Sequence, residues 1–165
     1  MIPFSPMRPG LSFPRLDEWN GTLPTGWDWQ PKINDERAVV HADGVVLNRH
    51  GRPFEKRKLW KLRHDIDAAL RAHPGQLLDV ALVGIRDPEI PARVVVLDLP
   101  RTPGPWSFRR TQIQLDFALP CYDDPRRCWA DFFGKPGYEG IVGRRLAAGY
   151  ACGDSNAMCK SKWIR

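Results

Sequence analysis

Basic side chains near the ends of predicted strands, together with one glutamate, are the residues of this sequence best suited to chemistry. Converging Lys and Arg side chains with a carboxylate suit a triphosphate and its metal ion. Composition alone favours a simpler explanation, a solvated basic face, so the order of the residues must decide. The basic residues are Lys32, Arg37, Arg49, Arg144, Arg145, Lys160, Lys162 and Arg165, and the carboxylate is Glu139.

Other catalytic patterns are missing from the sequence. There is no Gly-x-x-x-x-Gly-Lys loop, no Gly-x-Gly-x-x-Gly and no Gly-x-Ser-x-Gly, and the four histidines are scattered. The cysteines form two pairs with six residues between the members, whereas zinc sites usually place two to four there. We therefore expect free thiols in a reducing cytoplasm at Cys121, Cys128, Cys152 and Cys159.

The elements that must position the basic residues are short strands and one helix. A length of 165 residues predicts one domain. Asp43-Gly44 marks a hairpin turn, and Pro74-Gly75 ends an amphipathic helix. Residues 1–28 are rich in Pro and Trp, which predicts an extended N-terminal segment. We expect strands at 37–41, 45–48, 77–83, 93–99 and 138–146, a helix at 55–73, a loop at 101–110, and either helix or strand at 111–119.

Charge and hydropathy bound the class of protein. The net charge of +6 and the pI near 9.4 point to a polyanionic partner. No apolar run approaches the ~20 residues that cross a bilayer, and the N-terminus has no signal-peptide pattern. We expect a cytoplasmic protein with no membrane partner. Five arginines suit contacts with nucleic-acid phosphates: Arg101, Arg109, Arg110, Arg126 and Arg127.

The order of several short motifs resembles the covalent nucleotidyltransferases, which include ATP-dependent DNA ligases, RNA ligases and mRNA capping enzymes. Lys32-Ile33-Asn34-Asp35-Glu36-Arg37 is similar to motif I, Lys-x-Asp-Gly-x-Arg, and the stretch 138–145 is similar to motif IV. Each motif alone is weak, and their common order carries the resemblance. The other matches are the turn at 47–54, the motif III stretch 78–84, the stretch 96–99, the Arg-Arg helix start at 106–110 and the start of motif V at 162–165.

The resemblance implies an α+β nucleotidyltransferase (ligase adenylation) domain with two antiparallel sheets, flanking helices and the nucleotide between them. It places this minimal domain at 29–165, with no C-terminal oligonucleotide-binding-fold domain after it. Lys32 would be the nucleophile that takes AMP from ATP, and Glu139 would hold Mg²⁺. The nucleotide would be bound by Arg37, Arg49, Asp79, Leu97, Arg144, Lys162 and Arg165.

Some positions depart from the family pattern. Ala81 replaces the glutamate of motif III, and Leu97 replaces the aromatic residue that stacks on the base. Arg144 and Arg165 replace lysines that hold the α-phosphate, and arginine presents a planar fork where lysine presents a point charge.

Two hypotheses therefore stay open. The first is a DNA ligase-like adenylyltransferase, active in DNA repair as a monomer on nicked or broken duplex DNA. The second is a non-catalytic nucleic-acid-binding relative, which the alanine at position 81 favours.

Overall fold

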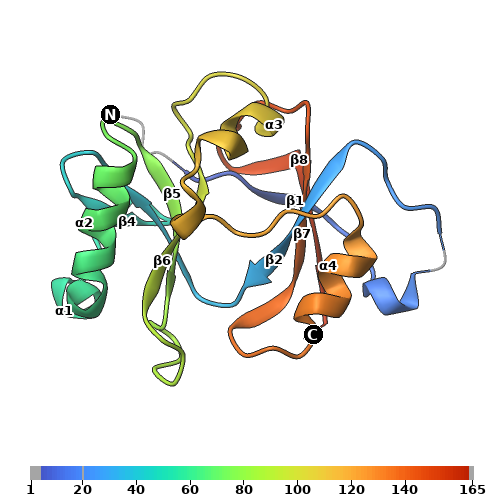
Figure 1. The fold of residues 1–165 in the computed structure, drawn as a ribbon, viewed down its shortest axis with the longest axis horizontal. Coiled ribbons are helices and arrows are strands. Elements are labelled where there is room, and N and C mark those ends of the chain that lie inside the picture. Colours follow the sequence, from blue (N-terminus) through green and yellow to red (C-terminus); the bar gives the residue numbers. More distant parts are fainter. Residues whose placement is uncertain (1–4, 20, 164–165) are drawn as a thin grey trace.

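The computed structural model describes residues 5–19 and 21–163 and contains two four-stranded β-sheets (Figure 1). One face of each sheet is covered by helix, and the other faces border a common cleft. The first sheet has the order β1 (Arg8–Ser12), β8 (Asp154–Lys162), β7 (Tyr138–Arg145), β2 (Trp27–Ile33). The second has the order β4 (Val46–Asn48), β3 (Glu36–Val40), β5 (Leu78–Val83), β6 (Arg93–Asp98).

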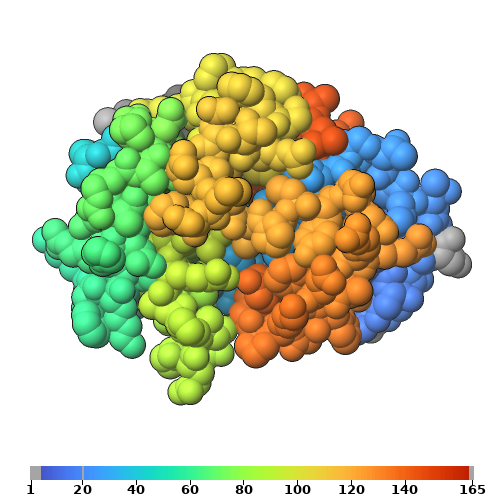
Figure 2. Space-filling view, in the orientation of Figure 1, coloured from blue at the N-terminus to red at the C-terminus, as the bar shows by residue number. Residues whose placement is uncertain are grey.

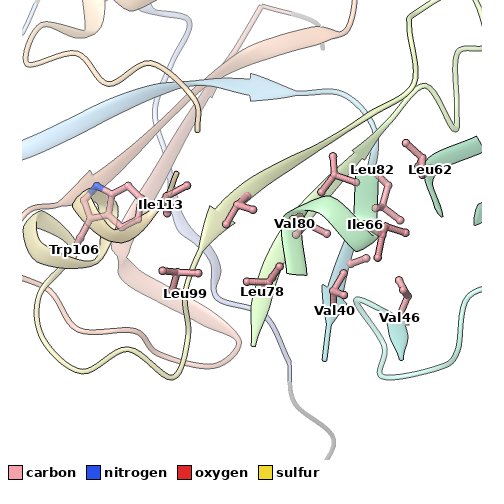
Figure 3. Packing of buried hydrophobic residues seen from close by; sticks show 14 residues of the cluster. Val40, Val46, Leu62, Ile66, Leu78, Val80, Leu82, Leu99, Trp106 and Ile113 are labelled. Atoms are coloured by element: carbon pink, nitrogen blue, oxygen red, sulfur yellow. The ribbon is translucent and has the colours of Figure 1, made fainter. Parts of the chain in front are cut away.

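The second sheet is fully antiparallel and packs against helix α2 (Arg63–Ala72). All six residues of β5 are buried, because α2 covers one face and a second apolar cluster with Val95 and Leu119 packs on the other. Leu78, Val80 and Leu82 point toward the helix, where they meet Leu62 and Ile66 (Figure 3). Alternation along the strand turns Asp79 and Ala81 to the other side, where Ala81 lines the cleft and Asp79 lies behind it.

The first sheet is mixed, which corrects the prediction of two antiparallel sheets. Strand β1 pairs with β8 in parallel, whereas β2, β7 and β8 are antiparallel. A parallel pair needs a long connection, and here nearly the whole chain lies between its two strands. The predicted extended N-terminal segment thus contributes a strand to this sheet, and the strand β2 spans the proposed boundary at residue 28.

Helix α4 (Pro125–Phe132) covers the outer face of the first sheet beside an aromatic cluster. The Asp124 carboxylate accepts a hydrogen bond from the Arg126 backbone N–H at 2.8 Å, and Pro125 occupies the first helical position. Both features favour a helix start. Trp129 packs edge-on to Trp163 from β8's end, with ring centroids 5.1 Å apart.

The predicted elements are confirmed for five strands and the long helix. That helix runs as α1 (Lys56–Leu59), a 3-10 turn at Trp60–Leu62 and α2, and it ends before Pro74. Two predictions were wrong. The loop predicted at 101–110 contains helix α3 (Trp106–Arg109), and residues 111–119 hold 3-10 turns rather than a helix or strand. These two 3-10 turns are Arg110–Gln112 and Leu115–Phe117, and a further one lies at Leu16–Glu18. Among the described residues, no helix is long and apolar enough to cross a bilayer.

Candidate functional site

A cleft of about 480 Å³ lies between the uncovered faces of the two sheets. This volume falls within the range of small-molecule sites, roughly 300–1,000 Å³. Strands of both sheets supply the walls, so a ligand in the cleft would touch both. The main lining residues are Arg8, Gln30, Lys32, Glu36, Arg37, Arg49, Ala81, Leu97, Glu139, Val142, Arg144, Met158, Lys160 and Lys162.

Strand alternation explains why the wall formed by the first sheet is polar. On β2, Gln30 and Lys32 line the cleft, while Trp27 and Trp29 belong to the aromatic core behind the sheet. Strand β8 alternates in the same way, with its lysines toward the cleft and Cys159 in the core. A period of two therefore gives one strand a charged face and a buried face.

Lys32, Glu139 and Lys162 form a cluster at the ends of three neighbouring strands. Lys32 pairs with Gly140 and Ile33 with Tyr138, so Glu139 is the extra residue of a β-bulge. Bulges redirect side chains, and this one brings the carboxylate of Glu139 to both lysines. One oxygen accepts a hydrogen bond from Lys32 Nζ, and the other accepts one from Lys162 Nζ at 2.8 Å.

The glycine after Glu139 allows this arrangement. A Cβ at Gly140 would collide with the carbonyl oxygen of Ser161 on β8. Any larger residue would push β7 and β8 apart at the point where Glu139 and Lys162 meet. The Glu-Gly pair of the motif is therefore explained by strand packing as well as by the carboxylate.

Burial and charge shift the pKa values of this cluster. Burial lowers the pKa of Lys32, with Lys162 and Lys160 adding to the effect, while the bonded Glu139 opposes it. Burial alone would raise the pKa of Glu139, but hydrogen bonds from Lys162 and Lys32 outweigh it and lower that pKa. Lys32 is thus easier to deprotonate than an ordinary lysine, with a carboxylate beside it.

Arg37 enters the cleft from the second sheet and is held from behind by Asp79. Its Nε donates to Asp79 Oδ1 at 2.8 Å, and the Tyr150 hydroxyl donates to Asp79 Oδ2 at 2.9 Å. Asp79 has no exposed surface and is not among the lining residues. The structure therefore places Asp79 behind Arg37, as the support of a cation that reaches the cleft.

A second buried carboxylate joins the two sheets at the inner end of the cleft. Asp98 on β6 accepts two hydrogen bonds from Arg109 of α3, at 2.8 and 3.1 Å, and one from Arg144 of β7 at 2.8 Å. The Arg144 guanidinium also lies 4.3 Å from the centroid of the Trp106 ring. Arg144 is thereby fixed in place, although the Arg144 Nε has no hydrogen-bond partner.

The part of the opposite wall formed by β5 and β6 is apolar. Leu97 and Ala81 belong to a small cluster with Val83, Val95 and Leu119. Ala81 lies opposite Arg37 in the β3–β5 pair and offers it no carboxylate, and the Arg37 guanidinium is bound instead by Asp79. This surface suits a flat apolar group such as a nucleobase, which Leu97 would contact without aromatic stacking.

Seven of the predicted site residues line this one cleft, from five strands and one turn. Asp79 lies behind them, and Arg165 is outside the described residues. Sequence reasoning did not single out Gln30 as a site residue, because β2 was not predicted, and it did not place Lys160 in the cleft. Of the arginines expected to contact phosphates, Arg109 is fully buried, which corrects that expectation, and Arg110 is paired with Asp28 at 2.7 Å.

The cleft fits a magnesium ion only with help from a ligand. Within residues 5–19 and 21–163 no three His, Cys, Asp or Glu side chains come together as a metal site. Mg²⁺ is commonly held by one or two carboxylates together with substrate phosphates. Glu139 can serve as such a carboxylate once a phosphate draws Lys32 or Lys162 away from it.

Comparison with known proteins shows that solved DNA ligase structures share this fold. No protein-family model matches the sequence, and no curated protein does. The ligase domain of M. tuberculosis LigD superposes with a TM-score of 0.67 and 19% identity, over 96% of this chain and 59% of that one. A mycobacterial DNA ligase D complexed with ATP and MES superposes with a TM-score of 0.65 and 18% identity, over 98% of this chain and 61% of that one.

A third structure comes from a study of Lig E DNA ligases that concerned DNA binding with a minimal scaffold. It superposes with a TM-score of 0.58 and 12% identity, over 93% of this chain and 68% of that one. These likenesses confirm the predicted resemblance at the level of the fold, which is that of a DNA ligase adenylation domain. The chain spans about 60% of the length of the first two ligase structures.

Proposed function

We propose that this protein is an ATP-dependent, DNA ligase-like adenylyltransferase that forms a lysine–AMP intermediate on Lys32. The observation that carries the proposal is the position of Lys32. It lies on the cleft wall, in contact with Glu139, and its pKa is lowered by burial and by neighbouring lysines. A nucleophilic lysine needs that environment, because only the neutral amine attacks.

The proposed first step is a phosphoryl substitution. The Lys32 ammonium loses its proton to solvent, a loss that burial and the neighbouring Lys162 and Lys160 favour. The amine then attacks the α-phosphorus of ATP, so that an N–P bond forms while the bond to the bridging oxygen breaks. Pyrophosphate leaves with that oxygen and the electron pair, and AMP stays on Lys32 as a phosphoramidate.

The cations around Lys32 suit the charge that develops in this step. Lys162 and Arg144 line the same wall, and Arg37 and Arg49 approach from the second sheet. Fixed positive charges near the phosphates lower the barrier because they need no reorganisation. Bound Mg²⁺ would supply further charge neutralisation, with Glu139 as its protein ligand.

Transfer of AMP to a nucleic-acid 5′-phosphate completes the proposed reaction. A 3′-hydroxyl would then displace AMP and join the two ends, the chemistry of DNA repair at nicked or broken duplexes. One structural relative was solved with ATP, and another was studied for DNA binding. Both support the choice of nucleotide and of partner.

Intact-mass measurement after incubation with ATP and Mg²⁺ tests the proposal. We expect the wild type to gain one adenylyl group and the Lys32→Ala variant to gain none. Lys135→Ala, which removes an exposed lysine outside the cleft, is the matched control and should label like the wild type. Equal labelling of Lys32→Ala and the wild type would remove Lys32 as the nucleophile.

The alternative is a nucleic-acid-binding relative without catalysis, and Ala81 is the observation that favours it. A glutamate at this position would face the cleft beside Arg37. If the wild type holds a weakened catalytic site, Ala81→Glu should raise the yield of adduct and Ala81→Gln should not. No adduct in any variant, with nucleic-acid binding intact, would select the non-catalytic function.

A further inference from the structure

The net charge of the protein is concentrated in one short segment. Residues 49–63, here called the basic segment, contain seven Lys and Arg against a single acidic residue, Glu55. Their net charge of +6 equals that of the whole chain, so the other 150 residues are balanced, with 18 charges of each sign. The basic segment runs from the turn after β4 through α1 to the start of α2, on one flank of the molecule (Figure 2).

The basic segment also presents an unusual tryptophan. Trp60 is 69% exposed, whereas Leu62, two residues later, is buried in the core against the second sheet. Lys61 Nζ lies 5.9 Å from the centroid of the Trp60 ring. The six cations other than Arg49 are Arg52, Lys56, Arg57, Lys58, Lys61 and Arg63, and all of them are exposed.

We propose that the basic segment docks an unpaired nucleic-acid strand, with one base stacked on Trp60 and its phosphates on the surrounding cations. Exposed aromatic rings among cations bind single strands in this way, because every base has a π-face and every nucleotide a charge. The proposal deepens the proposed function: strand docking stands by itself, whereas its role in holding a substrate beside the cleft rests on that function. It names a broken end with a single-stranded overhang as the substrate feature held beside the cleft.

Continuity with the cleft supports the choice of this partner. Arg49 begins the basic segment and also lines the cleft that contains Lys32. A strand on the basic segment would therefore pass a cation that reaches the proposed catalytic site. A lipid surface fits less well, because membrane-binding helices present a row of apolar side chains. Here Trp60 is the one large hydrophobic residue exposed within the basic segment.

Fluorescence anisotropy with labelled oligonucleotides tests the proposal without catalysis. The probes are a single strand, a blunt duplex and a duplex with a 3′ overhang, all without ATP. We expect Trp60→Ala to weaken binding of the single strand and the overhang by about 5- to 100-fold. Blunt-duplex affinity should change little, and Trp60→Phe should restore most of the loss.

Charge-removing substitutions test the contribution of the cations of the basic segment separately from that of Trp60. Replacing Lys56, Arg57 and Lys58 together by Gln should reduce the salt slope of single-strand binding by about 2, at roughly 0.7 per lost phosphate contact. The matched control replaces three exposed cations outside the segment and the cleft, Arg93, Lys135 and Arg145, by Gln and should leave that slope unchanged.

Lys32→Ala separates this proposal from the proposed function. It should keep full oligonucleotide binding while losing the adduct. Binding that ignores both Trp60→Ala and the triple substitution would overturn the docking proposal, even if the adduct forms. Capture of phosphatidylserine vesicles without oligonucleotide binding would overturn it in favour of a membrane surface.

Discussion

Lys32 differs from the other lysines of the chain through its neighbours rather than through its position in a motif. It is largely buried on β2 beside β7, it contacts the carboxylate of Glu139, and Lys162 and Lys160 lie close enough to affect its pKa. Glu139 and the lysines act on that pKa in opposite directions. Burial lowers the pKa of Lys32 most, and together with these opposing charges it sets the pH at which Lys32 becomes a nucleophile.

The pH dependence of adduct formation should report this balance. The rate should rise with pH as Lys32 loses its proton, and it should level off below the ordinary lysine pKa of ~10.4. Lys162→Met removes a cation that lowers the Lys32 pKa, so the profile should move to higher pH. Glu139→Gln removes a carboxylate that raises it, so that profile should move to lower pH. Single-turnover rates across the pH range provide the measurement, and a shift of both variants in one direction would contradict the argument.

At the scale of elements, the short helix α3 connects the two sheets. Trp106 Nε1 donates to Asp28 of β2 at 3.0 Å, while Arg109 binds Asp98 of β6. Asp98 in turn holds Arg144 of β7. The resemblance pointed to a helix start at these residues, and the structure shows that the arginine pair there serves the fold, since Arg109 has no exposed surface.

Removing Arg109 should therefore be costly. Arg109→Ala leaves the fully buried Asp98 with one remaining guanidinium, and loss of one partner of a buried ion pair costs about 3–5 kcal/mol. Urea denaturation should show a fall of that size in the free energy of unfolding. Arg101→Ala, at an exposed neighbour, should stay within about 0.5 kcal/mol. A similar small change for both variants would mean that α3 does not brace the sheets.

The start of α4 offers a smaller and cleaner effect. Asp124→Ala removes the side chain that caps the Arg126 backbone N–H, and loss of such a cap costs about 0.5–2 kcal/mol. Asp123→Ala removes the same charge one residue earlier, without a cap. Thermal unfolding of the two variants should therefore differ, with Asp124→Ala lower in Tm. If the two variants melt alike, the charge near the helix and not the cap explains the effect.

At the scale of the whole molecule, the strands around the hairpins were predictable, whereas β1, β2 and β8 of the first sheet were not. Strands β3 to β7 have apolar runs bounded by turn signals. No strand was predicted across the Pro- and Trp-rich stretch, but β2 is an edge strand of its sheet, where the proline at position 31 is tolerated. Strand β8 does not show the apolar run that would predict a strand, because its cleft face carries Lys160 and Lys162.

The candidate site was predictable to the same degree. Lys32, Glu139 and Lys162 were found from the order of motifs, yet their contact depends on the bulge at Glu139, which no local pattern shows. Asp79 lies in the motif III stretch, but its place behind Arg37 depends on the pairing of β3 with β5. The order of motifs thus selected the candidate residues, and strand register decided which of them reach the cleft.

Because the cleft is formed by both sheets, a nucleotide bound in it should increase the free energy of unfolding of the protein. A ligand that contacts both sheets binds the folded state alone, and at one hundred times its Kd it adds about 2.7 kcal/mol to the free energy of unfolding. For a chain of this size that corresponds to a rise in Tm of about 5–10 °C. Calorimetry with ATP should show the rise in Lys32→Ala, where no covalent adduct complicates the reading, and Arg37→Ala should reduce it. Inorganic triphosphate should stabilise less, because it leaves the apolar wall at Ala81 and Leu97 uncovered. Equal stabilisation by ATP and triphosphate would show that the cleft binds phosphate charge without using its apolar wall.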